Sequence, residues 1–119
     1  MKTAIVYASV HHGNTKKIVD AIAASSEVEL IDSTQVKEKD LSGYDWVGFA
    51  SGIYYGRFHQ PVLNFASVNL PADKKMFLIC TNGGNASWKS MEEIAAAKKA
   101  TIIDRFACKR YDTFGHSNW

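Results

Sequence analysis

The sequence predicts an α/β fold in which helices cover both faces of a five-stranded parallel sheet. Short apolar runs of the size of buried strands alternate along the chain with helical patterns, in the order βαβαβαβαβ. Polar segments that contain glycine follow strands one, three and four. Because parallel strands bring their carboxyl ends to one rim of the sheet, we expect these three segments to meet there and to bind a ligand.

Length and composition predict one globular domain over residues 1–119, with 46% hydrophobic and 22% charged residues. The net charge of +2 is spread along the chain, so we expect no nucleic-acid surface. No apolar run has the length of a signal peptide or a membrane span, and we therefore expect a cytoplasmic protein with no membrane contact. Cys80 and Cys108 lie in apolar runs, which predicts buried, reduced thiols and no metal site.

The first strand, loop and helix occupy residues 4–24. Residues 4–8 form the apolar run, residues 9–15 carry a glycine and several capping residue types, and apolar residues then recur at helical spacing. Such a loop points several backbone N–H groups at one spot, where the helix N-terminus adds about half a positive charge. A phosphate is the expected occupant. In a simpler alternative, Asn14 or Thr15 only caps the helix.

The rest of the chain continues the alternation. Residues 46–50 and 75–80 are apolar on both faces, which is typical of central strands. Pro61 suits the first turn of a helix. The remaining expected elements are an edge strand over residues 28–32, a short helix ending near residue 45, a helix over 90–103 and a last strand over 106–111.

The second rim segment, residues 51–60, is rich in glycine and tyrosine, and the third, residues 81–85, combines threonine, asparagine and glycine. Together the three segments offer donors for a phosphate, aromatic rings, and places where the backbone can approach a ligand closely. A flat aromatic ligand that carries one phosphate fits this set of groups.

At these residues the chain resembles the flavodoxin family. Residues 9–15 are similar to the family's phosphate loop, residues 51–56 fall where aromatic rings pack on the isoalloxazine of FMN, and residues 81–85 fall where the flavin edge is held. Order and spacing agree over residues 1–115. The resemblance implies a three-layer α/β/α fold with strand order 2-1-3-4-5. It also implies an electron-transfer protein that binds FMN non-covalently and acts with redox partner proteins.

The resemblance further implies which residues bind the cofactor. Residues of the first loop would hold the phosphate, and Tyr54 or Tyr55 would stack on the ring. A carbonyl at Gly52 or Gly56 would turn toward the flavin on reduction. The expected cofactor-binding residues are Ser9, His11, His12, Gly13, Asn14, Thr15, Ser51, Gly52, Ile53, Tyr54, Tyr55, Gly56, Thr81, Asn82, Gly83 and Gly84.

Two local departures from the family pattern concern charge. His12 stands where the family has a hydroxyl residue, in a loop one residue longer, and its ring N–H could donate to a phosphate. The second loop offers Arg57 and His59 and contains no carboxylate between Ser51 and Gln60. Fewer nearby anions destabilise the reduced anionic flavin less. We therefore expect the last one-electron reduction at a less negative potential than is usual in the family.

The third departure is length, because the chain stops a few residues past its last expected strand. The fifth helix of the family fold is missing, which would leave half of one apolar sheet face bare. We expect either a homodimer that covers this face or a chain trimmed of its natural C-terminus.

Two other classes of function compete with an electron carrier. One is a flavin oxidoreductase of the same fold, of the quinone reductase or protoporphyrinogen oxidase type; the second loop is similar to that of the oxidase, but the oxidase's long insertion is absent. The other is a receiver-like signalling module. That class needs an acidic cluster after the first strand and an aspartate after the third, where this chain has residues such as Ser9 and Ser51.

Overall fold

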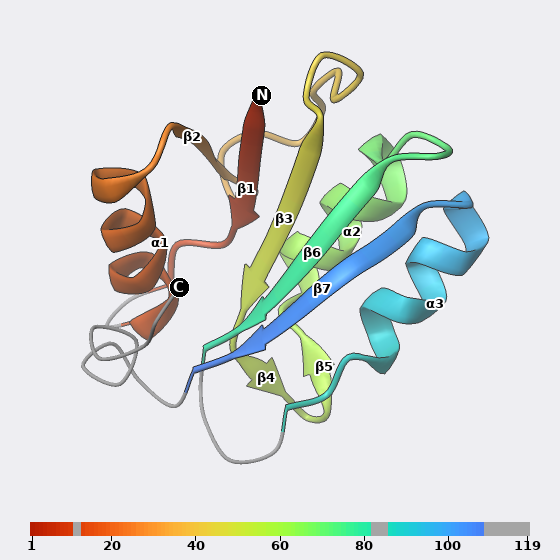
Figure 1. The fold of residues 1–119 in the computed structure, drawn as a ribbon. Helices are drawn as coiled ribbons and strands as arrows, with labels where there is room; N and C mark the ends of the chain where they lie inside the picture. The colour runs from red at the N-terminus through yellow and green to blue at the C-terminus, as the bar shows by residue number, and fades with distance from the viewer. Residues whose placement is uncertain (11–12, 82–85, 109–119) are drawn as a thin grey trace.

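A computed structural model describes residues 1–10, 13–81 and 86–108. Its main sheet has five strands in the order β2-β1-β3-β6-β7, all paired in parallel (Figure 1). The five strands are β2 (Val28–Asp32), β1 (Thr3–Tyr7), β3 (Trp46–Ser51), β6 (Lys75–Cys80) and β7 (Thr101–Ala107). Numbered along the chain within this sheet, the order is 2-1-3-4-5, which confirms the predicted topology.

Helices lie on both faces of the sheet (Figure 1). The helices α2 (Gln60–Asn69) and α3 (Lys89–Lys98) pack on one face, and their buried side chains join those of the strands in the larger apolar core. The helix α1 (Asn14–Ser25) packs on the other face with a smaller apolar cluster. Because side chains alternate along a strand, β1 contributes Ala4 and Val6 to the first core and Ile5 and Tyr7 to the second.

The crossover between β2 and β3 contains no helix, so the short helix expected before residue 45 is wrong. Its polar backbone groups pair with side chains instead. Asn69 accepts from the Lys39 N–H and donates to the Lys37 carbonyl, each over 2.9 Å, and Asp40 accepts from the Ser42 N–H. Local and distant side chains therefore satisfy several of the backbone groups that would bond one another in a helix.

The last helix and strand differ from the prediction. Helix α3 ends at Lys98 instead of residue 103, and β7 begins at Thr101 instead of residue 106. Lys99 adopts a left-handed conformation (φ 59°), which stops the helix, and its N–H bonds the Ala96 carbonyl. A lysine carries little signal for this conformation, whereas a glycine would have marked it.

The second rim segment folds into a small hairpin that the sequence did not indicate. Strands β4 (Ile53–Tyr54) and β5 (Arg57–Phe58) pair antiparallel across a two-residue turn. Both turn residues have positive φ, 54° at Tyr55 and 78° at Gly56. This is the backbone of a type I′ turn, whose usual Asn-Gly signature is replaced here by Tyr-Gly.

Candidate functional site

The carboxyl ends of β1, β3 and β6 bring the three rim segments together at Thr81, which is completely buried. Its N–H donates to the Ser51 carbonyl over 2.9 Å, so the third segment is attached to the second. The Asn14 amide donates to the Thr81 carbonyl over 2.7 Å, and the hydroxyls of Thr15 and Thr81 lie 2.6 Å apart. One residue thus joins the first residues of α1 to both other segments.

The turn before α1 has no room for a side chain at Gly13. The Gly13 N–H donates to the Val10 carbonyl over 2.9 Å, and an added Cβ would lie 2.5 Å from Val10 Cγ2. Real Cβ atoms essentially never approach other atoms so closely, so only glycine fits without opening the turn. Any residue can adopt the φ of −74° found at Gly13, so backbone conformation does not require glycine here. The turn requires glycine because the surrounding atoms leave no room for a Cβ.

Helix α1 begins without a side-chain cap. Gly13 is the N-cap residue, no side chain caps the helix, and its first turn has no acidic residue. The alternative in which Asn14 or Thr15 merely caps the helix is therefore wrong, because both side chains bond Thr81. Together with the positive end of the helix dipole, the uncapped N–H groups and the nearby hydroxyls provide the donor set that suits a phosphate group.

The hairpin is anchored at its base by Ser51, which is buried. The Ser51 hydroxyl donates to the Gly52 carbonyl over 2.6 Å and accepts from the His59 N–H over 2.8 Å. The rings of Tyr54 and His59 lie 4.7 Å apart and are tilted by 43°. Tyr55 at the tip is fully exposed. The hairpin thus presents the rings of Tyr54 and Tyr55 on a backbone that the Ser51 bonds constrain.

A second pair of bonds ties the hairpin to the segment that leads into α3. The Ser87 hydroxyl donates to the Gly56 carbonyl over 2.8 Å, and the Phe58 N–H donates to the buried Ser90 hydroxyl over 3.1 Å. These serines were not among the predicted site residues. Nothing in the sequence marks them, because their partners are distant backbone groups.

Asp32, the last residue of β2, is a further residue of this rim that the sequence did not predict. Its Oδ1 accepts from the Ser9 N–H over 3.2 Å and from the N–H and hydroxyl of Thr34 over 2.9 and 2.7 Å. Burial alone would raise the pKa of this carboxyl, but the bonds from Thr34 and Ser9 outweigh it and lower the pKa. An ionised carboxylate therefore positions the start of the first segment.

Of the predicted site residues, the structure brings together those from residues 9, 13–15, 51–56 and 81 at this rim. The remaining ones lie outside the described residues, namely His11, His12, Asn82, Gly83 and Gly84.

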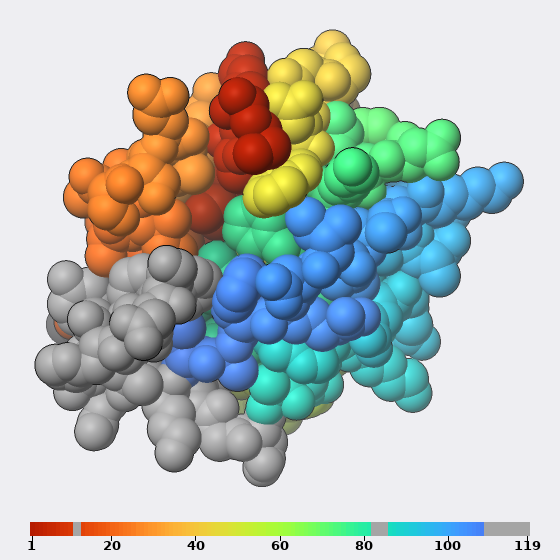
Figure 2. Space-filling view, in the orientation of Figure 1, coloured from red at the N-terminus to blue at the C-terminus, as the bar shows by residue number. Residues whose placement is uncertain are grey.

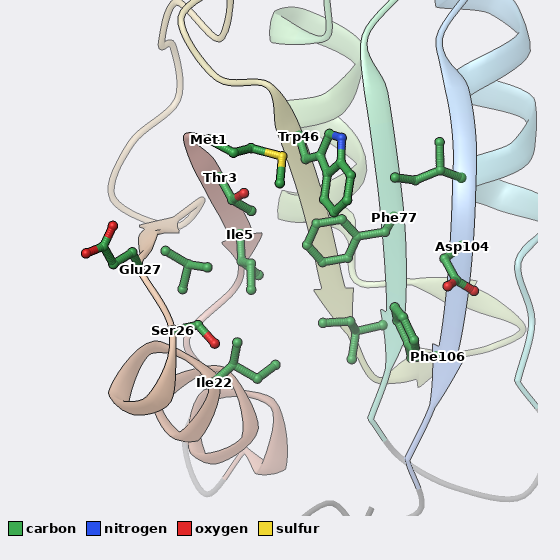
Figure 3. Close-up of a pocket in the computed structure, with 13 residues that line it drawn as sticks. Met1, Thr3, Ile5, Ile22, Ser26, Glu27, Trp46, Phe77, Asp104 and Phe106 are labelled. Atoms are coloured by element: carbon green, nitrogen blue, oxygen red, sulfur yellow. The ribbon is translucent and has the colours of Figure 1, made fainter. Parts of the chain in front are cut away.

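A separate apolar hollow of about 680 Å³ lies on the sheet face that carries α1. Trp46 and Met1 lie toward one end of it and Phe106 toward the other, with Phe77 between them (Figure 3). In Figure 2 the surface is hollowed between α1 and β7, with atoms of β6 at the floor. In the described part of the chain, α1 is the sole helix on this face. Its described lining is mainly apolar, with Thr3, Ser26, Glu27 and Asp104 as the polar members.

Comparison with known proteins agrees with this geometry. The flavodoxin domain family matches residues 4–111. The chain belongs to the flavodoxin family. An uncharacterized protein of Methanocaldococcus jannaschii is 33% identical over 119 aligned positions, which cover 97% of this chain and 79% of that protein.

Solved flavodoxin folds are similar in structure. Oxidised flavodoxin 2 from Bacillus cereus has a TM-score of 0.68 at 20% identity, with coverage of 97% of this chain and 91% of that chain. A flavoprotein from Lactobacillus acidophilus, solved in complex with FMN, has a TM-score of 0.68 at 18% identity, covering 89% of this chain and 92% of that chain. The predicted resemblance to the flavodoxin family and its fold is confirmed.

Among the described residues, no helix has the length and apolar character needed to cross a membrane. The same residues contain no group of three His, Cys, Asp or Glu side chains arranged to hold a metal ion.

Proposed function

We propose that this flavodoxin-family protein is an electron carrier that binds FMN non-covalently at the rim where its three segments meet. The observation that carries the proposal is the junction at Thr81, where an uncapped helix N-terminus, a glycine-dependent turn and an aromatic hairpin lie within one bonded unit. The bound isoalloxazine supplies the redox chemistry, and the protein supplies binding, orientation and electrostatics.

The first segment holds the phosphate in this proposal. Backbone N–H groups of Asn14 and Thr15 at the start of α1 donate to it, and the hydroxyls of Ser9 and Thr15 add donors. His11 and His12 belong to the same segment and contribute ring N–H donors. The Thr15 hydroxyl can serve both the phosphate and Thr81, because a hydroxyl donates once and accepts twice.

The second and third segments hold the flavin ring. Tyr54 or Tyr55 stacks on it, while backbone groups from Ser51 to Ile53 and at Gly56 line it. Thr81 to Gly84 contact its edge, through Asn82 and Gly83 above all. Since Arg57 and His59 are near and no carboxylate lies in the hairpin, the last one-electron reduction occurs at a less negative potential than is usual in the family.

The proposal also covers the location of the protein and the proteins that it contacts. The protein is a single cytoplasmic domain over residues 1–119 that exchanges electrons with partner proteins. A second copy covers the apolar hollow beside α1, because exposed apolar areas of this kind are normally buried.

The experiment that tests FMN binding is reconstitution of the purified full chain, monitored by quenching of flavin fluorescence. We expect tight binding that weakens at least about tenfold in Gly13→Ala, because the added Cβ forces the turn open. Gly43→Ala is the matched control, since a Cβ there meets nothing within 4 Å. A folded chain that takes up no FMN refutes the proposal. Rapid turnover of NADPH with a quinone, or of protoporphyrinogen, would favour the oxidoreductase alternative instead.

A further inference from the structure

The part of the chain that forms the second and third rim segments carries almost no negative charge. Between Trp46 and Met91 its sole acidic residue is Asp73. Asp73 precedes β6 and therefore lies at the end of the sheet opposite to the ligand rim. Its N–H donates to the Lys99 carbonyl. At the ligand rim the charged side chains of this stretch are Arg57, in β5, and Lys89, the first residue of α3.

Arg57 and Lys89 belong to one bonded unit. The bonds from Ser87 to Gly56 and from Phe58 to Ser90 connect the hairpin to the start of α3. The rings of Phe58 and Trp88, 6.3 Å apart, add an apolar contact between the same two elements. A surface built on this unit is held in place before anything binds to it, which lowers the entropy cost of binding.

Both cationic side chains are exposed, and within the described residues neither forms an ion pair. Most of the other charges of the described rim residues have partners. Asp32 is held by Ser9 and Thr34, whereas Lys17, exposed in the first turn of α1, forms no ion pair with a described residue. Lys16 pairs with Asp20 at 2.7 Å, and Glu92 pairs with Arg105 at 2.8 Å. The negative charge of Glu93, one helical turn after Lys89, partly offsets the positive charge of that lysine. Arg57 therefore contributes more than Lys89 to the positive potential of this surface.

Tyr55 lies beside Arg57 at the tip of the hairpin. Its side chain is fully exposed although its backbone has a φ of 54°, a conformation that tyrosine rarely adopts. Asparagine would be more stable at this position of the turn, so the tyrosine offers no advantage inside the flavin-free domain. When Tyr54 provides the ring that stacks on the flavin, the Tyr55 ring is left for a partner. Exposed tyrosine and arginine side chains are the types most enriched at the centres of protein interfaces.

We propose that the β4–β5 hairpin and the start of α3 form a docking surface for an acidic redox protein, with Arg57 and Lys89 as the steering charges and Tyr55 as the apolar contact. The proposal rests on the FMN function above, because the surface borders the rim where the flavin is proposed to lie. Electron-transfer complexes are small and short-lived, so complementary charge governs how often they form.

The test measures the local charge with inorganic electron acceptors. One electron passes from the reduced FMN protein to ferricyanide, an anion, or to tris(phenanthroline)cobalt(III), a cation. Between about 0.01 M and 0.15 M ionic strength the Debye length falls from about 30 Å to about 8 Å. We expect oxidation by ferricyanide to slow by roughly tenfold over this range, and oxidation by the cobalt complex to stay constant or accelerate.

Substitutions of lysine and arginine residues show which side chains produce the salt dependence. Arg57→Gln combined with Lys89→Gln should remove most of the salt dependence with ferricyanide, leaving about a twofold change. Lys75→Gln is the control, because it removes one exposed positive charge at the opposite end of the sheet and should leave the rates unchanged. An opposite sign of the salt dependence, or an equal effect of Lys75→Gln, would overturn the proposal.

A second measurement does not need the flavin. We would titrate the isotopically labelled chain, with and without FMN, with an acidic plant-type ferredoxin and with basic cytochrome c, and follow amide resonances by NMR. The expected result is shifts at Tyr55, Arg57 and Lys89 with the ferredoxin, lost in Arg57→Gln. Shifts elsewhere, or with cytochrome c alone, would refute the docking surface even if FMN binds. Failure to bind FMN would refute the carrier function while this measurement still decides the surface.

Discussion

A single buried threonine organises the ligand rim. Thr81 uses its N–H, carbonyl and hydroxyl on three different partners, and all of these groups are inaccessible to water. Buried polar groups of this kind contribute little when paired but cost much when one partner is lost. The position of the first segment therefore depends on a residue 66 or 67 positions further along the sequence.

Thr81→Val should lower the free energy of unfolding by about 1–3 kcal/mol, because it leaves the buried Thr15 hydroxyl without its partner. Thr81→Ser, which keeps the hydroxyl, should lose clearly less. Urea unfolding of both variants followed by circular dichroism is the measurement. Equal losses in the two would mean that packing of the methyl group, and not the hydroxyl bond, holds the segments together.

Asp32 predicts a pH dependence of stability. Its pKa is lower in the folded chain than in the unfolded chain, so the unfolded state binds the proton more tightly. The stabilisation is complete above the unfolded pKa, about 3.9, and is lost as the pH falls through the folded pKa. Asp32→Asn should therefore cost about 1 kcal/mol at neutral pH and progressively less in acid. Unfolding midpoints measured across this pH range would show a constant difference if the carboxylate charge does not matter.

At the scale of elements, the first four strands of the main sheet were predictable, whereas the last strand and the connections were not. Apolar runs such as residues 75–80 need burial on both faces, so the central strands could be identified from their composition. The end of α3 depends on a left-handed Lys99, and the hairpin depends on positive φ at Tyr55, neither of which the residue type signals. The predicted rim residues that are described lie at one rim, whereas Asp32, Ser87 and Ser90 join it through contacts that only folding creates.

Tyr55→Asn tests the hairpin. Asparagine adopts positive φ more readily, and the exposed tyrosine ring loses no contact when removed. The free energy of unfolding should therefore rise by about 0.5–1 kcal/mol. Thermal unfolding of the FMN-free chain measures it, with Tyr54→Asn as a control that gains nothing because Tyr54 is in a strand. A loss of stability in Tyr55→Asn would show that its ring makes contacts within the domain.

At the scale of the whole molecule, the two sheet faces differ. The face under α2 and α3 contains the larger core, whereas the face under α1 keeps the hollow beside β7. Ile103 lines this hollow and is 40% exposed, and Phe77 fits into it because Gly48 has no Cβ below the ring. Apolar groups in such a position favour contact with another apolar surface.

Sedimentation equilibrium tests whether a second copy supplies that surface. We expect a dimer at micromolar concentration that dissociates at least about tenfold more readily in Ile103→Glu, because a buried unpaired carboxylate is costly. Val68→Glu is the control, since Val68 is also an exposed apolar residue but lies on α2, away from the hollow. A monomeric wild-type chain, or equal effects of the two variants, would contradict the dimer.

The sequence by itself determined the first four strands of the main sheet, the helices after strands one, three and four, and the three polar segments that follow the same strands. These features follow from the local period of apolar residues and from residue type. The tertiary structure alone decided that Thr81 joins the segments, that residues 53–58 form a hairpin, and that one face keeps a hollow. The physical reason is distance along the chain. Hydrogen bonds between residues 66 or 67 positions apart form only once the parallel strands have brought their ends together.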